Sequence, residues 1–364
     1  MSTRFNSAAL TALAAAALFG ATTPLAKLLL GELAPFVLAG LFYLGSGIGL
    51  AVTLLARRVR RIVRDSGTGR MAPEHQPMER IAARDTLWLA GAIAAGGVCG
   101  PALLMFGLQA TPAASASLLL NLEGVFTAVM AWCLFRENVD WQIFLGMVAI
   151  VAGGVALSWQ PGAFGLSPGA LLVVAACLAW AIDNNLTRKI STHDAAVIAC
   201  VKGLVAGSTN LAIGLALGAS MPAFATVAAA MIVGFAGYGV SLVLFIVALR
   251  HLGTARTGAY FSVAPVIGVA LSLAIWPAWP NVAFWGAALL MGVGVWLHLR
   301  ERHMHEHTHE PLEHSHRHRH DDGHHVHEHD CAWDGQEPHA HPHRHMPITH
   351  THAHYPDIHH RHRH

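Results

Sequence analysis

The sequence predicts an all-α polytopic membrane protein with ten transmembrane helices arranged as two inverted five-helix repeats. Three observations lead to this fold class. First, 54% of the 364 residues are hydrophobic and only 12% are charged, which is far more apolar than an ordinary soluble domain. Second, the apolar residues gather in runs of membrane-crossing length. Third, segments of the first half can be laid on segments of the second half in the same order.

The apolar runs each have about 20 residues, which is the length that an α-helix needs to cross the hydrocarbon core. They lie near residues 8–30, 34–56, 86–108, 112–134, 140–159, 168–187, 195–217, 224–249, 255–276 and 280–298. The breaks between them contain proline, glycine, asparagine or charged residues. Several breaks are so short that neighbouring helices are expected to form antiparallel hairpins.

Positive charge predicts the orientation. If the N-terminus is cytoplasmic, all but Lys27 and Lys202 of the 23 basic residues fall on inner loops or on the two ends. The positive-inside rule therefore places both termini in the cytoplasm, in a bacterial-type inner (plasma) membrane. The basic block at 57–64, "RRVRRIVR", is expected to anchor this topology or to contact anionic lipid, and we expect no nucleic-acid partner.

Internal similarity divides the chain. Residues 108–135 can be laid without a gap on 249–276, residues 146–157 on 286–297, and residues 18–27 on 179–188. Because each half has five helices, an odd number, the second half enters the membrane from the opposite side. Inverted repeats are typical of secondary transporters. We expect one repeat at 1–159, a second at 160–298, and a separate tail at 299–364.

The matching segments "ATPAASASLLLNLEGVFTAVMAWCLFREN" and "GTARTGAYFSVAPVIGVALSL" resemble those of EamA-type permeases of the drug/metabolite transporter superfamily. The resemblance covers about residues 8 to 298. It implies transport of a small solute, such as an amino acid, a metabolite, a nucleotide sugar or a toxic organic compound. Where the family often has Glu-Pro, this chain has Glu123-Gly124, whereas Pro265 is kept in the second half. A proline kink is therefore expected in the second half alone.

Ionisable side chains inside a membrane bundle are costly and are candidates for function. Glu123, in the predicted fourth helix, can accept a proton or face a cationic group of a substrate. The structural alternative is a hydrogen bond to a neighbouring helix. Asn121 is expected on a different face of that helix, where an interhelical hydrogen bond is the simpler interpretation.

Asp183 and Lys202 are predicted at similar depths in the antiparallel sixth and seventh helices, so we expect an ion pair. It can serve as an inner gate or as a structural lock. Trp180, one turn before Asn184, is expected to face the cavity if Asn184 does. Further hydroxyl and aromatic candidates for a central cavity, each with a single structural hydrogen bond as the alternative, are Tyr238, Ser241, Tyr260 and Ser262.

The tail has a different composition. Of the 27 histidines, all but four lie at or after His303. From position 299 on, the tail has seven arginines and eleven acidic residues. Imidazoles ligate Zn, Ni, Co and Cu ions, and the sequence does not choose among these metals. We expect the tail to be disordered without metal, with passive buffering as the alternative role. The first metal-ligand candidates are His303, His305, His307, His309, His314, His316, His318, His320, His324, His325, His327 and His329.

These observations predict a secondary transporter of a small solute, with efflux as the expected direction, and a metal-binding cytoplasmic tail. In the alternative, the transported solute is the transition-metal ion itself and the tail is its reservoir or sensor. No phosphate-binding glycine loop or nucleophile constellation is present, so we expect neither an ATPase nor another enzyme, and no required cofactor. The expected partners are membrane lipid, the solute and divalent metal ions, and a homodimer is left open.

Overall fold

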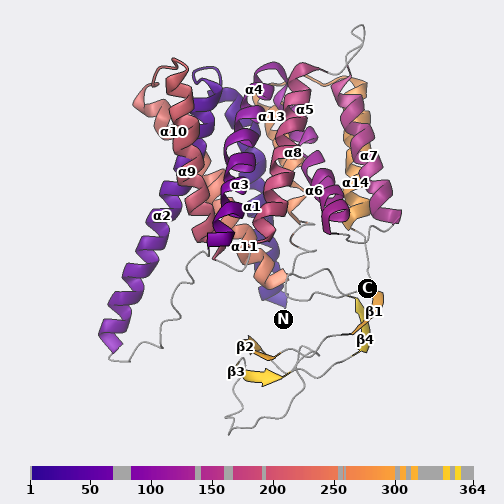
Figure 1. Cartoon of the computed structure of the whole chain (residues 1–364). Helices are drawn as coiled ribbons and strands as arrows, with labels where there is room; N and C mark the ends of the chain where they lie inside the picture. Colours follow the sequence, from indigo (N-terminus) through magenta and orange to yellow (C-terminus); the bar gives the residue numbers. More distant parts are fainter. Residues whose placement is uncertain are drawn as a thin grey trace. The chain divides into compact units, whose positions relative to one another are not determined.

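The structure is a computed structural model, and it describes residues 2–68, 83–135, 141–159, 167–190, 194–252, 257, 260–299, 304–308, 313–318, 339–344 and 349–353. The chain separates into two compact units, Met1–Arg300 and Glu301–His364. The first unit is a bundle of helices (Figure 1). The second contains the histidine-rich segments.

The first half of the bundle follows the predicted order of apolar runs. Its helices are α1 (Ser2–Leu29), α2 (Pro35–Thr68), α3 (Ala83–Ala92), η1 (Ile93–Cys99), α4 (Gly100–Ala110), α5 (Ala113–Leu119), α6 (Leu122–Phe135) and α7 (Trp141–Ser158). The segments α3, η1 and α4 run on without a break, so they form one long rod of which the middle part is a π-helix.

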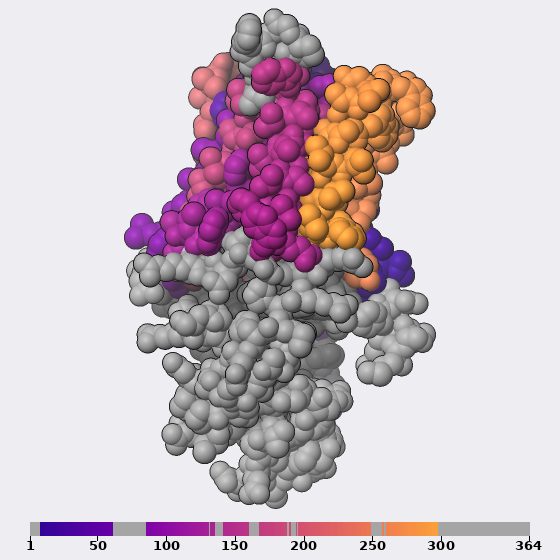
Figure 2. Space-filling model, turned by 90° about the vertical axis from the view of Figure 1, so that its right-hand side faces the viewer, coloured from indigo at the N-terminus to yellow at the C-terminus, as the bar shows by residue number. Residues whose placement is uncertain are grey.

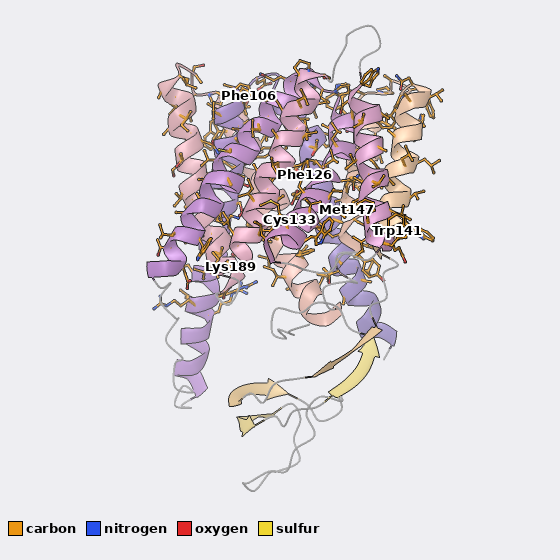
Figure 3. All side chains as sticks on the ribbon, turned by 45° about the vertical axis from the view of Figure 1, so that its right-hand side comes forward. Phe106, Phe126, Cys133, Trp141, Met147 and Lys189 are labelled. Carbon is orange, nitrogen blue, oxygen red and sulfur yellow. The ribbon has the colours of Figure 1, made fainter. Side chains whose placement is uncertain are left out.

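The second half has a similar order. Its helices are α8 (Pro168–Arg188), α9 (Ala195–Ala216), α10 (Phe224–Gly234), η2 (Phe235–Val240), α11 (Ser241–Leu252), α13 (Ala264–Ile275) and α14 (Val282–Leu299). Here α10, η2 and α11 form the continuous rod with a π-helical middle. Figure 3 shows Phe106 near one end of the bundle and Trp141 and Lys189 near the other, with Phe126 between them.

Eight helical segments within the described residues are long and apolar enough to cross a membrane. The chain is therefore a multi-pass helical membrane protein. The expected ninth and tenth spans correspond to shorter apolar helices, Ala264–Ile275 and Val282–Leu297. The ninth is short because a turn at residues 262–263 separates α13 from the helical residues before it.

The fourth apolar run is also interrupted, which the sequence did not predict. Residues 120 and 121 form a turn between α5 and α6, closed by hydrogen bonds from the amides of Asn121 and Glu123 to the carbonyls of Leu118 and Leu120, both 3.1 Å. The expectation concerned a proline kink in the second half alone, and the first half also breaks here, without a proline. The gapless alignment has an offset of 141 residues, which takes 120–121 to 261–262.

The same offset relates the two π-helices. It takes residues 93–99 to 234–240, and η2 spans Phe235–Val240. The hydrogen bonds of a π-helix span one more residue than those of an α-helix, and such segments are rare but frequent at functional sites. Both halves therefore widen the helix at a matching place in the third apolar run, in addition to breaking it at a matching place in the fourth.

Helix packing has the same pattern in both halves. The helix α1 packs on α11 and α13, and α8 packs on the corresponding α4 and α6. Two further pairs, α2 with α9 and α7 with α14, join helices at the same position in each half. Figure 2 shows the face on which α7 and α14 lie side by side, in magenta and orange.

Glycines allow the backbones of neighbouring helices to approach closely. This is common in membrane proteins, where the hydrophobic effect does not drive helices together and small residues at the interface allow tight packing. A methyl group at Gly45 on α2 would lie 2.1 Å from the carbonyl oxygen of Met231 on α10, and one at Gly234 would lie 2.1 Å from the carbonyl of Phe42. The fully buried Leu38, Leu41 and Phe42 fill the core beside these contacts. The glycines therefore set the distance between α2 and α10.

The second unit contains four short strands, β1 (Met304–Thr308), β2 (Glu313–His318), β3 (His339–Arg344) and β4 (Thr349–Ala353). The strands form two antiparallel pairs, β1 with β4 and β2 with β3. Along these strands the backbone is paired, which differs from the disorder expected of the metal-free tail. The remaining tail residues lie outside the described part of the chain, so disorder of the tail as a whole stays a prediction.

We expect Gly45→Ala to destabilise the bundle by about 1–3 kcal/mol, the usual cost of overpacking a core. The added methyl group meets a backbone oxygen that cannot rotate away. Thermal unfolding of the purified protein in detergent measures the effect as a lower Tm.

Gly292→Ala is the matched control, since no heavy atom lies within 4 Å of the position a methyl group would take there. Equal Tm values for the two variants would show that α2 and α10 can separate freely.

Candidate functional site

A cavity of about 370 Å³ lies where the two interrupted helices meet. Its size falls in the usual range for small-molecule sites. It is lined by both breaks, with Leu120, Asn121, Glu123 and Gly124 on one side and Phe261, Ser262, Ala264 and Pro265 on the other, and by Phe19, Gly20, Thr23, Ser117, Ile150 and Val295. Most of the wall is apolar, with a few polar groups from α1, α5, α6 and the segment before α13.

Glu123 lies at the start of α6, where the break places it against α8. Its Oε1 accepts a hydrogen bond of 2.9 Å from the side-chain amide of Asn184, which also donates to the hydroxyl of Thr127 at 3.3 Å. The neighbouring Asn185 donates to the carbonyl of Ala181 at 2.9 Å. The carboxylate is thus held by a neutral donor, and its charge is available to a ligand in the cavity.

Asn121 occupies the turn itself and not a separate face of a continuous helix, so the expected separation from Glu123 is wrong. Its side-chain amide donates to the carbonyl of Leu118 at 2.9 Å and caps the end of α5. The interhelical hydrogen bond expected for this amide is replaced by that local cap. Both Asn121 and Glu123 line the cavity.

The structure brings Asp183 and Lys202 together. The ammonium of Lys202, on α9, donates to both carboxylate oxygens of Asp183, on α8, at 2.6 Å each. Asp183 also accepts from the hydroxyl of Thr187 at 2.9 Å. The side chains of Lys202 and Asp183 are 16% and 8% exposed. Water reaches them little, so each charge is stabilised mainly by the other. Asp183 adjoins Asn184, and one turn of α8 therefore contacts both the ion pair and the cavity carboxylate.

The ion pair also touches the π-helix of the first half. A methyl group at Gly96 in η1 would lie 2.0 Å from Oδ2 of Asp183, and one at Gly237 in η2 would lie 1.9 Å from Cγ2 of Thr22. The alignment offsets relate Gly96 to Gly237 and Thr22 to Asp183. In each half, a glycine of the π-helix thus packs against a polar residue of the first helix of the other half.

Trp180 does not line this cavity, and neither does Asn184, to which the expectation for Trp180 was tied. Its indole N–H donates to the carbonyl of Gly96 at 2.9 Å, which also accepts from the hydroxyl of Tyr43 at 2.8 Å. The carbonyl of Gly97 accepts from the amide of Asn210 at 3.0 Å. The cause lies in Pro101, which has no N–H to serve Gly96 at π-helical spacing or Gly97 at α-helical spacing.

The remaining candidates divide between the cavity and the packing around it. Ser262 lines the cavity. Ser241 is buried and donates to the carbonyl of Ala15 on α1 at 3.0 Å. Tyr260 packs against a small alanine cluster. Tyr238 packs among rings, with centroids 5.9 Å from Phe19 and 5.4 Å from Tyr43, so it borders the cavity only through Phe19.

Of the fourteen wall residues, the sequence predicted only Asn121, Glu123 and Ser262; the missed polar and aromatic ones are Phe19, Thr23, Ser117 and Phe261. Phe19 and Phe261 have ring centroids 5.5 Å apart. Ser117 is 1% exposed and its hydroxyl has no hydrogen-bond partner among the described residues. Its place four residues before Asn121 in a run of small residues was the available signal, and small residues alone do not separate a wall from helix packing.

The predicted metal-ligand candidates all lie in the tail. Among the residues that the structure describes, no group of three or more His, Cys, Asp or Glu side chains is arranged to hold a metal ion. The backbone register of the tail strands sets histidine opposite histidine, at His305 and His352, at His307 and His350, and along β2 and β3. His303, His309, His320, His324, His325, His327 and His329 lie outside the described residues.

Comparison with known proteins assigns the chain to a class and then to a family. A bundle of apolar helices around a mostly apolar cavity with a few polar groups is the architecture of a membrane transporter. The family model for EamA-like transporters matches the chain twice, at residues 6–159 and 167–300. The chain belongs to the EamA-like transporter family, whose members are transporters and not enzymes.

Two similar proteins agree with this assignment. An uncharacterised transporter of Methanothermobacter thermautotrophicus is 30% identical over 269 residues, which cover 71% of this chain and 76% of that protein. A solved crystal structure matches with a TM-score of 0.56 and 19% identity, covering 80% of this chain and 96% of that one. The structural match supports the fold alone.

We expect Lys202→Met to destabilise the protein by about 3–5 kcal/mol, because it leaves the charge of Asp183 without a counter-ion in an apolar bundle. Thermal unfolding in detergent measures the loss of stability. The double variant Asp183→Asn, Lys202→Met is expected to recover most of it, since no unpaired charge remains.

If Lys202→Met alone unfolded like the unaltered protein, the pair would be too well hydrated to hold α8 against α9.

Proposed function

We propose that the protein is a secondary transporter that carries a small organic solute through the central cavity by alternating access, with export as its direction. The observation that carries the proposal is the position of the cavity between two interrupted helices at matching places in the two halves. Broken helices at the interface of inverted repeats supply binding groups in many transporters, because their free ends and side chains face a common site.

The proposal includes ten membrane-crossing helices in two inverted five-helix repeats. Three features support it: the matching breaks, the matching π-helices, and the helix packing that keeps its pattern when the halves are exchanged. Two similar halves that can exchange conformations expose a central site first to one side and then to the other. The shorter α13 and α14 take the ninth and tenth places in this arrangement.

Within this cycle we assign Glu123 to substrate binding or proton coupling and the Asp183–Lys202 pair to an inner gate. The pair joins α8 to α9, and the adjacent Asn184 joins α8 to Glu123. A ligand that draws Glu123 away from Asn184 therefore acts on the same turn of helix that holds the pair. Asn121, Ser262, Tyr238, Tyr260, Ser241 and Trp180 are assigned to supporting the cavity or its walls.

The distribution of basic residues supports an inner (plasma) membrane location with both termini and the histidine-rich tail in the cytoplasm. We assign the tail to binding Zn, Ni, Co or Cu ions. Histidines two apart in sequence share one face of an extended strand, and the antiparallel register pairs histidine with histidine between neighbouring strands. No cofactor is required for transport through the cavity.

The second candidate, transport of the metal ion itself, is favoured by the tail alone. The cavity has one carboxylate, one amide and a few hydroxyl groups, whereas transition-metal sites usually combine several imidazole, thiolate or carboxylate ligands. A tail that senses or buffers metal beside an organic-solute site is therefore the preferred arrangement. Uptake and efflux by proteoliposomes, tested with metal ions and with metabolites, separate the two candidates.

We expect Glu123→Gln to abolish coupled transport in proteoliposomes while the protein stays folded. The amide keeps the shape of the side chain and can still meet Asn184, but it can neither carry a negative charge nor take up a proton. Uptake driven by an imposed pH gradient is the measurement.

Glu32→Gln is the control, because that carboxylate meets Thr226 and does not line the cavity. Full transport with unchanged pH dependence in Glu123→Gln would make Glu123 a structural residue.

We expect the full chain to bind several Zn or Ni ions at pH 7.5 and far fewer at pH 5.5, since a protonated imidazole, with an ordinary pKa of about 6.5, cannot ligate a metal. Calorimetric titration of the purified protein measures the binding, and a chain truncated after residue 302 is the matched comparison.

Similar binding at both pH values would exclude imidazole ligands. A metal response of transport that persists in the truncated chain would exclude a regulatory tail.

A further inference from the structure

The charge of the cavity wall restricts what can occupy it. Glu123 is the one ionisable residue among the residues that line the cavity. The ammonium of Lys202 is engaged by both oxygens of Asp183. Lys27 donates to the carbonyl of Leu108 and, at 3.2 Å, to that of Gln109, at the end of α4. Neither of these two lysines lines the cavity, so the cavity has a net negative charge whenever Glu123 is ionised.

Two aromatic residues line the same cavity. The rings of Phe19 on α1 and Phe261 beside the second break have centroids 5.5 Å apart and an interplanar angle of 38°. The face of an aromatic ring attracts a cation, most strongly where water is excluded, and quaternary ammonium groups are recognised in this way. An anion would meet both the carboxylate and the negative faces of these rings.

The third feature of the wall is a buried hydroxyl group without a hydrogen-bond partner among the described residues. The hydroxyl of Ser117 is buried, lines the cavity and has no hydrogen-bond partner among the described side chains and backbone. A buried hydroxyl without a partner costs free energy until a ligand or water supplies one. Together with the carboxylate of Glu123, which can accept a hydrogen bond from an ammonium N–H, it makes this part of the wall polar.

Resting on the transport function proposed above, we propose that the substrate class of this cavity is the amphipathic organic cation, an amine or quaternary ammonium compound with an apolar or aromatic body. The cationic group lies between Glu123 and the rings of Phe19 and Phe261. The apolar body lies against Leu120, Ile150 and Val295. On binding, the cation competes with Asn184 for Glu123. Occupancy of the cavity therefore changes a contact of the turn of α8 that also contains Asp183.

The test uses three probes of similar size that differ in charge: 2-phenylethylamine, 2-phenylethanol and phenylacetate. Calorimetry on the full chain in detergent at pH 7.5 compares their affinities. We expect 2-phenylethylamine to bind at least about tenfold more tightly than the neutral and anionic probes. We expect benzyltrimethylammonium, which has no N–H to donate, to bind as well, and Phe261→Leu to weaken it.

Glu123→Gln is expected to reduce binding of the amine at least about tenfold and to leave binding of 2-phenylethanol unchanged. Glu32→Gln, outside the cavity, is expected to change neither. Equal affinities for the three probes, preference for phenylacetate, no binding of either cation, or an amine affinity that does not depend on Glu123 would each overturn the proposal.

These outcomes are separate from those that test transport. Proteoliposomes loaded with the metabolite panel report whether the protein moves any solute through the cavity. A protein that transports an uncharged or anionic metabolite and ignores the cations would retain the transport function and refute the substrate class. A protein that binds the cations through Glu123 but moves no solute would retain the ligand class of the cavity and refute the transport function.

Discussion

The structure depends on one constraint: a polar group inside an apolar bundle must find its partner within the protein. Pro101 shows how far the constraint reaches. It supplies no N–H at the point where the π-helix gives way to α-helical spacing, and the carbonyls of Gly96 and Gly97 are served instead by side chains from three other helices, α2, α8 and α9. One missing N–H thus ties the π-helix to its surroundings, and the position of Trp180 follows from it.

The same constraint explains the charged residues. Asp183 and Lys202 satisfy each other, while Glu123 has only the neutral amide of Asn184 and the cavity before it. A closed pair favours stability and fixed geometry, whereas a carboxylate with one neutral donor keeps the capacity to bind something else. The adjacent residues Asp183 and Asn184 of α8 contact one charge of each kind, Lys202 on α9 and Glu123 on α6.

Much of the bundle could be predicted from the sequence because apolar runs of fixed length leave few alternatives, and equal depth in antiparallel neighbours was enough to place Asp183 near Lys202. The turn at Leu120 and Asn121 could not be predicted, since neither proline nor glycine marks it. The wall residues Phe19, Ser117 and Phe261 were missed for a related reason. Which face of a helix borders a cavity depends on helix rotation, and helices that are apolar on all sides do not encode rotation in a periodic pattern.

The two halves differ where it matters most for a carrier. Ala264 occupies the place in the second half that Glu123 occupies in the first, so exchanging the shapes of the halves does not return an equivalent molecule. In the alternating-access cycle proposed above, the inward-open and outward-open forms of the empty protein then differ in free energy, and one of them predominates. The return of the empty cavity in that proposed cycle is a step of its own, with a rate that differs from that of the loaded cavity.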